Sequence, residues 1–379
     1  MKNKLFNCCL LLLFISVLTI PLITFQFEGS IRDENENRML ADYPSLEGGI
    51  SQIIHGSFMR EVEAWINDHI GERKAFRSIY ANLFHRILKI STVDTVVFGK
   101  DGWLFYTGDG NLKLCKGEYP VSQQDFEKIT LTQSDIWESY RAEGKRYFLL
   151  LTPSKVTVYP EYLPFEANEN RIYLIDQLED ALNAEDRLVV INTTRPLLAA
   201  KDQQELLFFK TDTHWNARGT YEAYKYVISC ISDDEPIQIS EFQNGRRLGD
   251  LNKMLGLADE SATENAPSPI YSWQAEIMQP DEKLIEIAKK YSQKEGMEYQ
   301  APVVFHNQSK AGKGTLVLYG DSMTGEWIYL PAYLAEHYEY VVHLGTQYQL
   351  IPEIEELVHA TDVIYQRTER FIINKLLNF

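Results

Sequence analysis

The chain opens with an apolar run and continues with segments whose hydrophobic residues recur at two different spacings. Residues 10–25 are almost entirely apolar and match the length of one membrane-spanning helix. Between residues 57 and 89, hydrophobic side chains recur every three or four positions, which predicts one or two amphipathic helices with a break near Gly71. In residues 96–106, two short hydrophobic runs flank an Asp-Gly pair, which is typical of a β-hairpin.

From residue 123 onward, helical periodicity alternates with short, strongly hydrophobic strands. The pattern predicts strands at 146–152, 188–191, 315–319, 340–343 and 362–365, and helices at 123–143, 174–184, 219–229 and 327–336. Residues 257–300 are acidic, contain proline and show little periodicity, so we expect a loop-rich insertion there. Because strands that alternate with helices form a mostly parallel sheet covered on both faces, the fold class is α/β.

The N-terminal apolar run predicts a membrane anchor. Lys2 and Lys4 precede it, which places the N-terminus in the cytoplasm and the rest of the chain outside. The run ends without the small residues of a signal-peptidase site, and Cys8 and Cys9 precede the apolar core, which does not fit a lipoprotein cysteine. We therefore favour an uncleaved signal-anchor over residues 1–27, with a cleaved signal peptide as the alternative. Residues 28–95 are assigned to a stalk and N-terminal helices, and residues 96–379 to the α/β domain.

The net charge of the chain restricts the classes of molecule that it is expected to bind. Lys and Arg number 37 against 54 Asp and Glu, a net charge of -17. Phosphate binding needs a basic face, so this balance argues against nucleic acid and disfavours long-range capture of a polyanion. The exported part retains Cys115 and Cys230. An oxidising compartment permits a disulfide between these two cysteines. The alternative, that they are two separate buried thiols, is given equal weight.

Two short motifs carry possible chemistry. Gly320-Asp321-Ser322 directly follows a predicted buried strand, and active sites of open α/β sheets lie at the carboxyl ends of the strands. A serine on such a turn exposes its hydroxyl beside backbone N–H groups, although the same residues also form ordinary turns.

The second motif is Asp212-Thr213-His214, in which the carboxylate can orient the imidazole as a general base if the segment is extended. The alternatives are an N-cap aspartate with a surface histidine, or two metal ligands. Further ligands with suitable spacing for a metal site are not found in the sequence.

Taken together, six segments resemble the SGNH-like proteins that O-acetylate exopolysaccharides, of the AlgJ/AlgX type of alginate biosynthesis, and the related DHHW proteins. In this family, Asp-x-His precedes Gly-Asp-Ser, a permuted order relative to ordinary SGNH esterases. This chain has Thr213 where the name DHHW implies histidine, and its acidity fits poorly with a polyanion such as alginate. The matching segments are Asn37-Arg38, residues 99–106, Pro153-Ser154-Lys155, residues 211–215, Gly249-Asp250-Leu251 and Gly320-Asp321-Ser322.

The resemblance implies an SGNH-hydrolase-like (flavodoxin-like) parallel sheet flanked by helices, with acyltransferase activity in residues 96–379. If the roles of the family's motif residues apply here, Ser322 is the nucleophile, His214 is the general base and Asp212 orients His214. Ser322 would take an acetyl group from a donor and pass it to a hydroxyl of an extracytoplasmic polysaccharide. A membrane-bound O-acyltransferase would supply the donor, and no metal or cofactor is implied. The alternatives are an esterase with the same triad and a non-catalytic scaffold of polysaccharide secretion.

Three further residues are weaker candidates for substrate binding. Lys155 follows a strand end, where it would contact an anionic group or remain solvated. Arg370 would reach the site from the last strand or pair with Glu369 at the surface. Trp215, beside His214, is expected to shape the pocket, whereas Trp103 is expected to pack within the hairpin.

Overall fold

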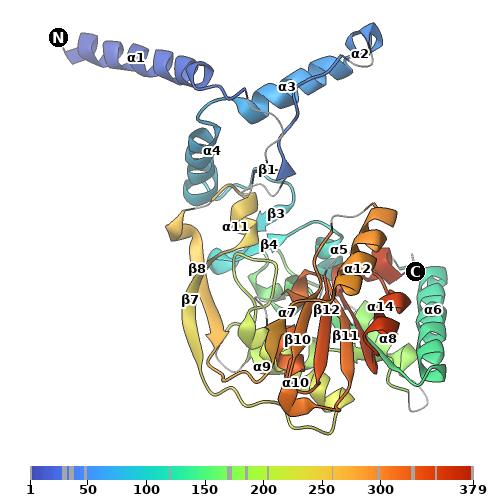
Figure 1. Cartoon of the computed structure of the whole chain (residues 1–379). Coiled ribbons are helices and arrows are strands. Elements are labelled where there is room, and N and C mark those ends of the chain that lie inside the picture. The colour runs from blue at the N-terminus through green and yellow to red at the C-terminus, as the bar shows by residue number, and fades with distance from the viewer. Residues whose placement is uncertain are drawn as a thin grey trace. The chain divides into compact units, whose positions relative to one another are not determined.

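The computed structural model divides the chain into two compact units. One unit contains residues 1–94 and 250–262, and the other contains residues 95–249 and 263–379 (Figure 1). The structure describes residues 2–27, 32–33, 38–46, 49–118, 121–168, 173–183, 187–202, 205–257, 259–296, 299–325, 329–345 and 348–376.

The first unit begins with the long apolar helix that the sequence predicts. Its stretch Phe6–Ile23 has a mean hydropathy of 2.5, so it is long and apolar enough to cross a membrane. The predicted break at Gly71 is confirmed, because one helix ends at His69 and the next begins at Arg73. The elements of this unit are α1 (Lys2–Ile23), β1 (Arg32–Asp33), β2 (Arg38–Met39), α2 (Ile50–Ile54), α3 (Ser57–His69), α4 (Arg73–Ala81), the π-helical η1 (Asn82–Ile87), α11 (Asp250–Met254) and η4 (Glu260–Ala262).

The second unit is the α/β domain. Its strands are β3 (Val96–Phe98), β4 (Leu104–Tyr106), β5 (Arg146–Thr152), β6 (Val190–Asn192), β7 (Phe242–Leu248), β8 (Thr263–Pro269), β9 (Glu276–Met278), β10 (Val303–His306), β11 (Thr315–Tyr319), β12 (Tyr340–Leu344) and β13 (Asp362–Thr368). Its helices are α5 (Asn111–Lys116), α6 (Gln123–Ala142), α7 (Lys155–Val158), α8 (Leu174–Leu182), α9 (Thr194–Lys201), α10 (Ala217–Ile231), α12 (Glu282–Lys294), α13 (Leu330–Ala335), α14 (Pro352–Leu357) and α15 (Ile372–Leu376). Short 3-10 turns are η2 (Lys100–Gly102), η3 (Pro160–Tyr162), η5 (Gln308–Lys310), η6 (Ser322–Thr324) and η8 (Glu369–Phe371).

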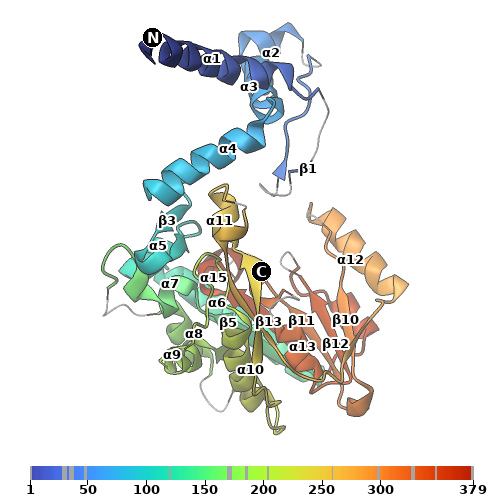
Figure 2. The same ribbon diagram turned by 90° about the vertical axis from the view of Figure 1, so that its left-hand side faces the viewer.

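In the described part of the chain, the central sheet has seven strands in the order β6-β5-β13-β11-β12-β10-β9. Figure 2 shows β5, β13, β11, β12 and β10 side by side in this order. The pairs from β6 to β12 are parallel, as predicted, and β10 and β9 pair antiparallel at one edge. Strand β11 lies in the middle of this sheet, so the turn that follows it emerges at the centre of the carboxyl edge.

Alternate residues of the central strands enter two hydrophobic cores, one on each face of the sheet. In β11, Leu316 and Leu318 pack into one core, and Val317 and Tyr319 pack into the other. Helices α7, α9, α10 and α13 cover the first face, and α6, α8, α12, α14 and α15 cover the second (Figures 1 and 2). Each fully buried Leu, Val or Phe contributes about 1.5–3 kcal/mol to the stability of the folded domain.

The expectation of a loop-rich insertion at residues 257–300 is wrong for most of that segment. It contains β8, β9 and the 13-residue helix α12. Strand β8 carries Pro267 and Pro269, and it is stabilised by antiparallel pairing with β7, a partner that local periodicity does not reveal. Helix α12 buries Leu284, Ala288 and Ser292, a spacing of four that the acidic composition obscured.

The remaining local predictions hold with adjusted boundaries. The hairpin β3–β4 forms, but residues 99–103 connect it, so the turn is longer than a two-residue Asp-Gly turn. The helix expected at 327–336 begins at Leu330, and residues 326–328 lie outside the described part of the chain. Cys115 and Cys230 are not joined by a disulfide.

Candidate functional site

The Gly-Asp-Ser motif forms a tight turn at the end of β11. The Gly320 N–H donates to Leu344 O of β12 at 3.0 Å, and a side chain at Gly320 would collide with the Thr324 hydroxyl. Asp321 is a structural residue, because its carboxylate accepts the N–H of Met323 at 2.9 Å and that of Thr368 in β13 at 2.6 Å. Ser322 is the first residue of η6 and is half-buried. The turn is therefore tied to the strands on both sides of β11.

A buried histidine supports the same turn from beneath. His343 Nε2 lies 2.9 Å from Thr324 Oγ1. Burial lowers the pKa of His343 to about 4, so the ring is neutral near pH 7. A neutral ring avoids the cost of a buried charge beside Thr324.

The Asp-His motif lies in a tight loop, which we call the Asp-His loop (residues 209–214). A β-bridge joins Phe208 and Trp215, and the Phe209 N–H donates to His214 O at 3.2 Å, so the loop closes on itself. The segment is therefore not extended, which was the condition under which the sequence analysis expected the two side chains to point the same way. The two side chains still meet, because Asp212 Oδ1 accepts the His214 backbone N–H at 3.1 Å and lies 2.5 Å from His214 Nδ1.

Both residues are protected from water. Asp212 is 0% exposed and His214 is 9% exposed. An aspartate on Nδ1 fixes the imidazole tautomer and leaves Nε2 as the nitrogen that exchanges a proton with a reacting group. Asp212 and His214 also offer oxygen and nitrogen atoms of the kinds that bind metals, but their direct hydrogen bond is the arrangement of a general base and its orienter.

A lysine and a glutamate hold the Asp-His loop from two directions. The buried Lys155 ammonium donates to the carbonyl oxygens of Phe209, Lys210 and Asp212 at 3.2, 3.1 and 2.7 Å. The Glu264 carboxylate accepts the N–H groups of Lys210 and Thr211 at 2.7 and 2.8 Å, and also the Thr211 hydroxyl. One cation thus binds carbonyls of the loop and one anion binds its amides.

A third charged residue reaches the orienting aspartate. Arg247 of β7 lies with its Nε 3.5 Å from Asp212 Oδ2. Arg247 and Glu264 face each other across the β7–β8 hairpin, so one hairpin delivers both contacts. Neither residue has a local signal in the sequence, because their positions follow from the pairing of two strands that the periodicity did not predict.

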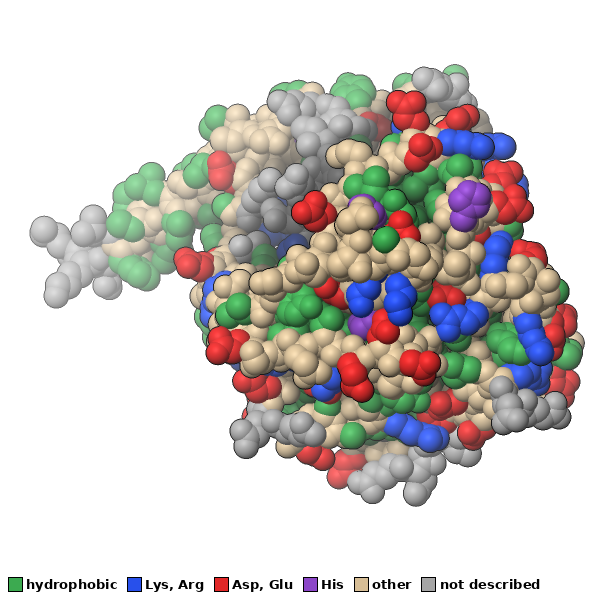
Figure 3. Space-filling view, turned by 60° about the horizontal axis from the view of Figure 1, so that its bottom comes forward, with side chains coloured by type: hydrophobic (Ala, Val, Ile, Leu, Met, Phe, Trp, Pro, Cys, Tyr) green, Lys and Arg blue, Asp and Glu red, His purple; other side chains and the backbone are tan. Residues whose placement is uncertain are grey.

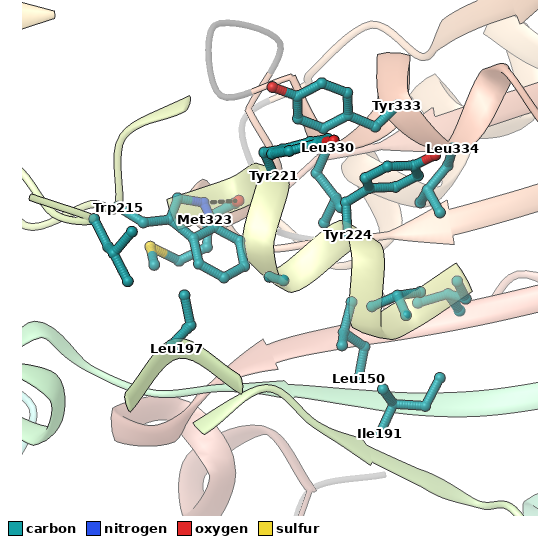
Figure 4. Close-up of a cluster of buried hydrophobic side chains, with 14 of the residues drawn as sticks. Leu150, Ile191, Leu197, Trp215, Tyr221, Tyr224, Met323, Leu330, Tyr333 and Leu334 are labelled. Carbon is teal, nitrogen blue, oxygen red and sulfur yellow. Dashed lines mark hydrogen bonds between the residues drawn. The ribbon is translucent and has the colours of Figure 1, made fainter. Parts of the chain in front are cut away.

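The two motifs are linked through the residues next to them. The Trp215 indole N–H donates to Met323 O at 2.9 Å, and Figure 4 shows this bond inside the core between α9 and α10. Trp215 directly follows His214, and Met323 directly follows Ser322. The bond therefore brings the turn that carries Ser322 and the loop that carries His214 against each other.

The residues predicted with less support, Trp215, Lys155 and Arg370, lie in different environments. The Trp215 ring is 0% exposed, so it shapes the site from within the core. Lys155 is 4% exposed and its contacts with the Asp-His loop favour a role in holding that loop, while the predicted substrate contact stays a prediction. Arg370 is buried, with its guanidinium carbon 4.5 Å from the centre of the Phe371 ring, so the expected surface position is wrong and its predicted substrate contact stays a prediction. Trp103 packs on Phe105 of the hairpin, as expected, and also on Tyr162 outside it.

Comparison with known proteins shows similarity of this domain to polysaccharide acetylation proteins. Residues 96–292 match a family described as the SGNH hydrolase-like domain of the acetyltransferase AlgX. The probable alginate O-acetylase AlgJ of Pseudomonas fluorescens is 24% identical over 189 residues, which cover 49% of this chain and 45% of that protein. The AlgJ of Pseudomonas syringae pv. tomato is 25% identical over 186 residues, which cover 49% of this chain and 46% of that protein. The chain thus spans less than half the length of these relatives.

One solved structure supports the fold assignment. Bacillus cereus PatB1 superposes with a TM-score of 0.50 at 14% identity, and the match covers 74% of this chain and 98% of PatB1. At this identity, the similarity concerns the fold alone. The SGNH-like fold predicted from the sequence is confirmed by these matches.

Proposed function

Since the chain belongs to the family of AlgX-type SGNH hydrolase-like acetyltransferase domains, we propose that it transfers an acetyl group to a hydroxyl of a polysaccharide outside the cytoplasm. Its relatives named as probable alginate O-acetylases support this reaction class. The observation that carries the assignment to residues is the hydrogen bond between Asp212 and His214, in a loop joined through Trp215 to the turn of Ser322.

In the first half of the proposed reaction, Ser322 attacks the carbonyl carbon of the acetyl donor. His214 Nε2 takes the hydroxyl proton, and Asp212 stabilises the imidazolium through Nδ1. The tetrahedral intermediate collapses, the bond to the leaving group breaks, and His214 returns the proton to that group. The product of this half-reaction is acetyl-Ser322.

In the second half, a sugar hydroxyl replaces the leaving group. His214 Nε2 removes the proton of this hydroxyl as its oxygen attacks the acetyl-serine carbonyl. Collapse of the second intermediate breaks the bond to Ser322 Oγ, which recovers the proton from His214. The acetyl group ends on the sugar, and the enzyme returns to its starting state.

The turn itself supplies a donor for the oxyanion of both intermediates. The N–H groups of Met323, Thr324 and Gly325 are directed to Asp321 Oδ1, Asp321 O and Ser322 O. The Ser322 N–H precedes these bonds at the start of the turn, beside the Oγ that attacks. We assign it the role of oxyanion donor. Removal of one such donor from an enzyme lowers kcat by a factor of about 10²–10³.

The apolar helix α1 suits a protein that works at a membrane. In the proposed arrangement α1 anchors the chain, the α/β domain lies outside the cytoplasm, and an integral O-acyltransferase delivers acetyl groups. Acidic and basic side chains are interspersed over the face seen in Figure 3, and the net charge is -17. Acceptor capture therefore depends on local contacts more than on long-range attraction.

The proposal is tested with the full chain in detergent micelles and a chromogenic acetyl ester. Wild type should cleave the ester, form acetyl-serine detectable by mass spectrometry, and move the acetyl group to an added polysaccharide. Ser322→Ala should abolish all three with an unchanged thermal melting curve. Retention of wild-type turnover by Ser322→Ala would exclude Ser322 as the nucleophile, and acetyl transfer to water alone would identify an esterase.

A further inference from the structure

We propose that a pocket beside the Asp-His loop binds an uncharged sugar residue of the acceptor, a proposal that rests on the function proposed above. The pocket has a volume of about 360 Å³. It lies between residues 205–210, the first residues of α10 and the β7–β8 hairpin, all within the α/β domain. This size is at the lower end of the range for small-molecule sites.

The wall of the pocket is continuous with the Asp-His loop. Lys210 and Glu264 both line it, and Glu264 holds the backbone of Lys210 and Thr211 by hydrogen bonds of 2.7 and 2.8 Å. A ligand in the pocket therefore lies against Lys210, which is two residues before Asp212 in the Asp-His loop. Ser322 and His214 are not among the lining residues, so the pocket holds a sugar that neighbours the acetylated one along the polymer.

The lining combines apolar surface with neutral polar groups. Leu206, Phe208, Phe209 and Pro267 supply the apolar part, and Leu206 is the exposed side chain among them. Asn244 and Asn265 supply amides from the two strands of the hairpin, and Asn265 Nδ2 donates to Asn244 Oδ1 at 3.0 Å. An amide both donates and accepts, as a sugar hydroxyl does, and the C–H face of a pyranose packs on apolar side chains.

The charged side chains in the lining balance one another. Arg218 pairs with Glu205 and lies over the Phe242 ring at 4.7 Å. Lys210 Nζ is 3.4 Å from Asp101 O, and Glu264 is held by the Asp-His loop. A uronate carboxylate is normally bound by a guanidinium or ammonium group directed at it, and these two cations are directed at protein groups. The pocket thus favours a neutral sugar over a uronate.

Binding to the full chain in detergent micelles tests this inference by isothermal titration calorimetry. The probes are neutral hexasaccharides of glucose, mannose and N-acetylglucosamine, and an anionic hexasaccharide of mannuronate. The test variant carries Asn244→Ala and Asn265→Ala. The matched control is Gln243→Ala, an exposed position on the same strand that does not line the pocket.

At least one neutral hexasaccharide should bind wild type and the Gln243→Ala control equally. The double variant should bind it about 10- to 100-fold more weakly, because two amide contacts with the sugar are lost. Binding of mannuronate as tight as that of the neutral probes would overturn the ligand class. Absence of binding by every probe, or equal binding by the double variant, would overturn the site.

These outcomes are separate from those of the ester assay. Saccharide binding requires no acyl-serine chemistry, so it can also be measured with Ser322→Ala. Loss of serine-dependent turnover would reject the proposed reaction and leave the binding result standing. Turnover with wild-type saccharide binding by the double variant would reject the pocket alone.

Discussion

Glu264→Gln should lower turnover without disturbing the sheet, because Glu264 contacts the Asp-His loop and no strand of the central sheet. In the protein, one carboxylate accepts the Lys210 N–H at 2.7 Å, the Thr211 N–H at 2.8 Å and the Thr211 hydroxyl. A glutamine keeps one acceptor oxygen. Its amide nitrogen would face a backbone N–H, where two donors meet and no bond forms.

The magnitude follows from the bonds that are lost. A hydrogen bond to a charged group contributes about 1.5–3 kcal/mol, and the lower end applies here because Glu264 is only half-buried. If the whole of this free energy is lost from the stabilisation of the transition state because His214 is displaced, kcat falls about tenfold. A difference of about 1.4 kcal/mol corresponds to a factor of ten in rate. Glu264→Ala removes every acceptor and should lower kcat further, by about 100-fold on the same reasoning.

The assay is ester turnover by the full chain, with kcat and KM measured separately and the melting temperature recorded. The matched control is Gln243→Ala on the same hairpin, which should leave both constants unchanged. We expect kcat to decrease from wild type to Glu264→Gln and again to Glu264→Ala, with similar melting temperatures for all three proteins. A kcat within about twofold of wild type for Glu264→Ala would refute the role of this carboxylate in positioning the loop.

Three further predictions concern the residues around the site. Asp212→Asn should lower kcat about 10³- to 10⁴-fold with the fold intact, because an amide no longer fixes the tautomer of His214, and ester kinetics with a melting curve check this. Trp215→Phe should lower kcat about tenfold and reduce the free energy of unfolding by about 1–3 kcal/mol, because Met323 O loses its buried donor; urea unfolding with ester kinetics measures both, and full activity would contradict the link. Because the pKa of His343 is about 4 in the folded protein and about 6.5 when unfolded, the unfolded chain takes up the proton first as the pH falls. The free energy of unfolding should therefore drop by about 2 kcal/mol from pH 7 to pH 5, and urea unfolding of His343→Gln should lack this component.

The sequence predicted the parts of the fold that depend on local patterning. Strands β5 and β11 coincide with the predicted residues 146–152 and 315–319, because uniformly apolar runs of this length suit a strand buried on both faces. The hairpin β7–β8, the edge strand β9 and its neighbour β10 were not predicted. The residues of β7, β8 and β9 are mixed in polarity, and pairing with other strands determines their conformation.

The same division applies to the candidate site. Asp212 and His214 are two residues apart, so their pairing could be expected from the sequence, although the loop that achieves it is tight and not extended. Glu264 lies more than fifty residues from Thr211 along the chain, and its contact exists only because β7 and β8 fold back over the loop. A single sequence contains no pattern that reports such a contact.

The proposed nucleophile and the proposed base are held in place by different parts of the domain. Substitutions near the two residues should therefore have different effects on stability and on turnover. Ser322 lies on a turn whose bonds reach β12 through Leu344 and β13 through Thr368, so its position is part of the sheet. His214 lies on a loop held by the side chains of Lys155 and Glu264, outside the sheet ladder. Changes that disturb the turn, such as a side chain at Gly320, must also disturb strand packing and should appear first as lost stability. Changes at the loop leave the strands untouched and should appear as lost turnover in a folded protein, so the pattern of stability against kcat across variants distinguishes the two supports.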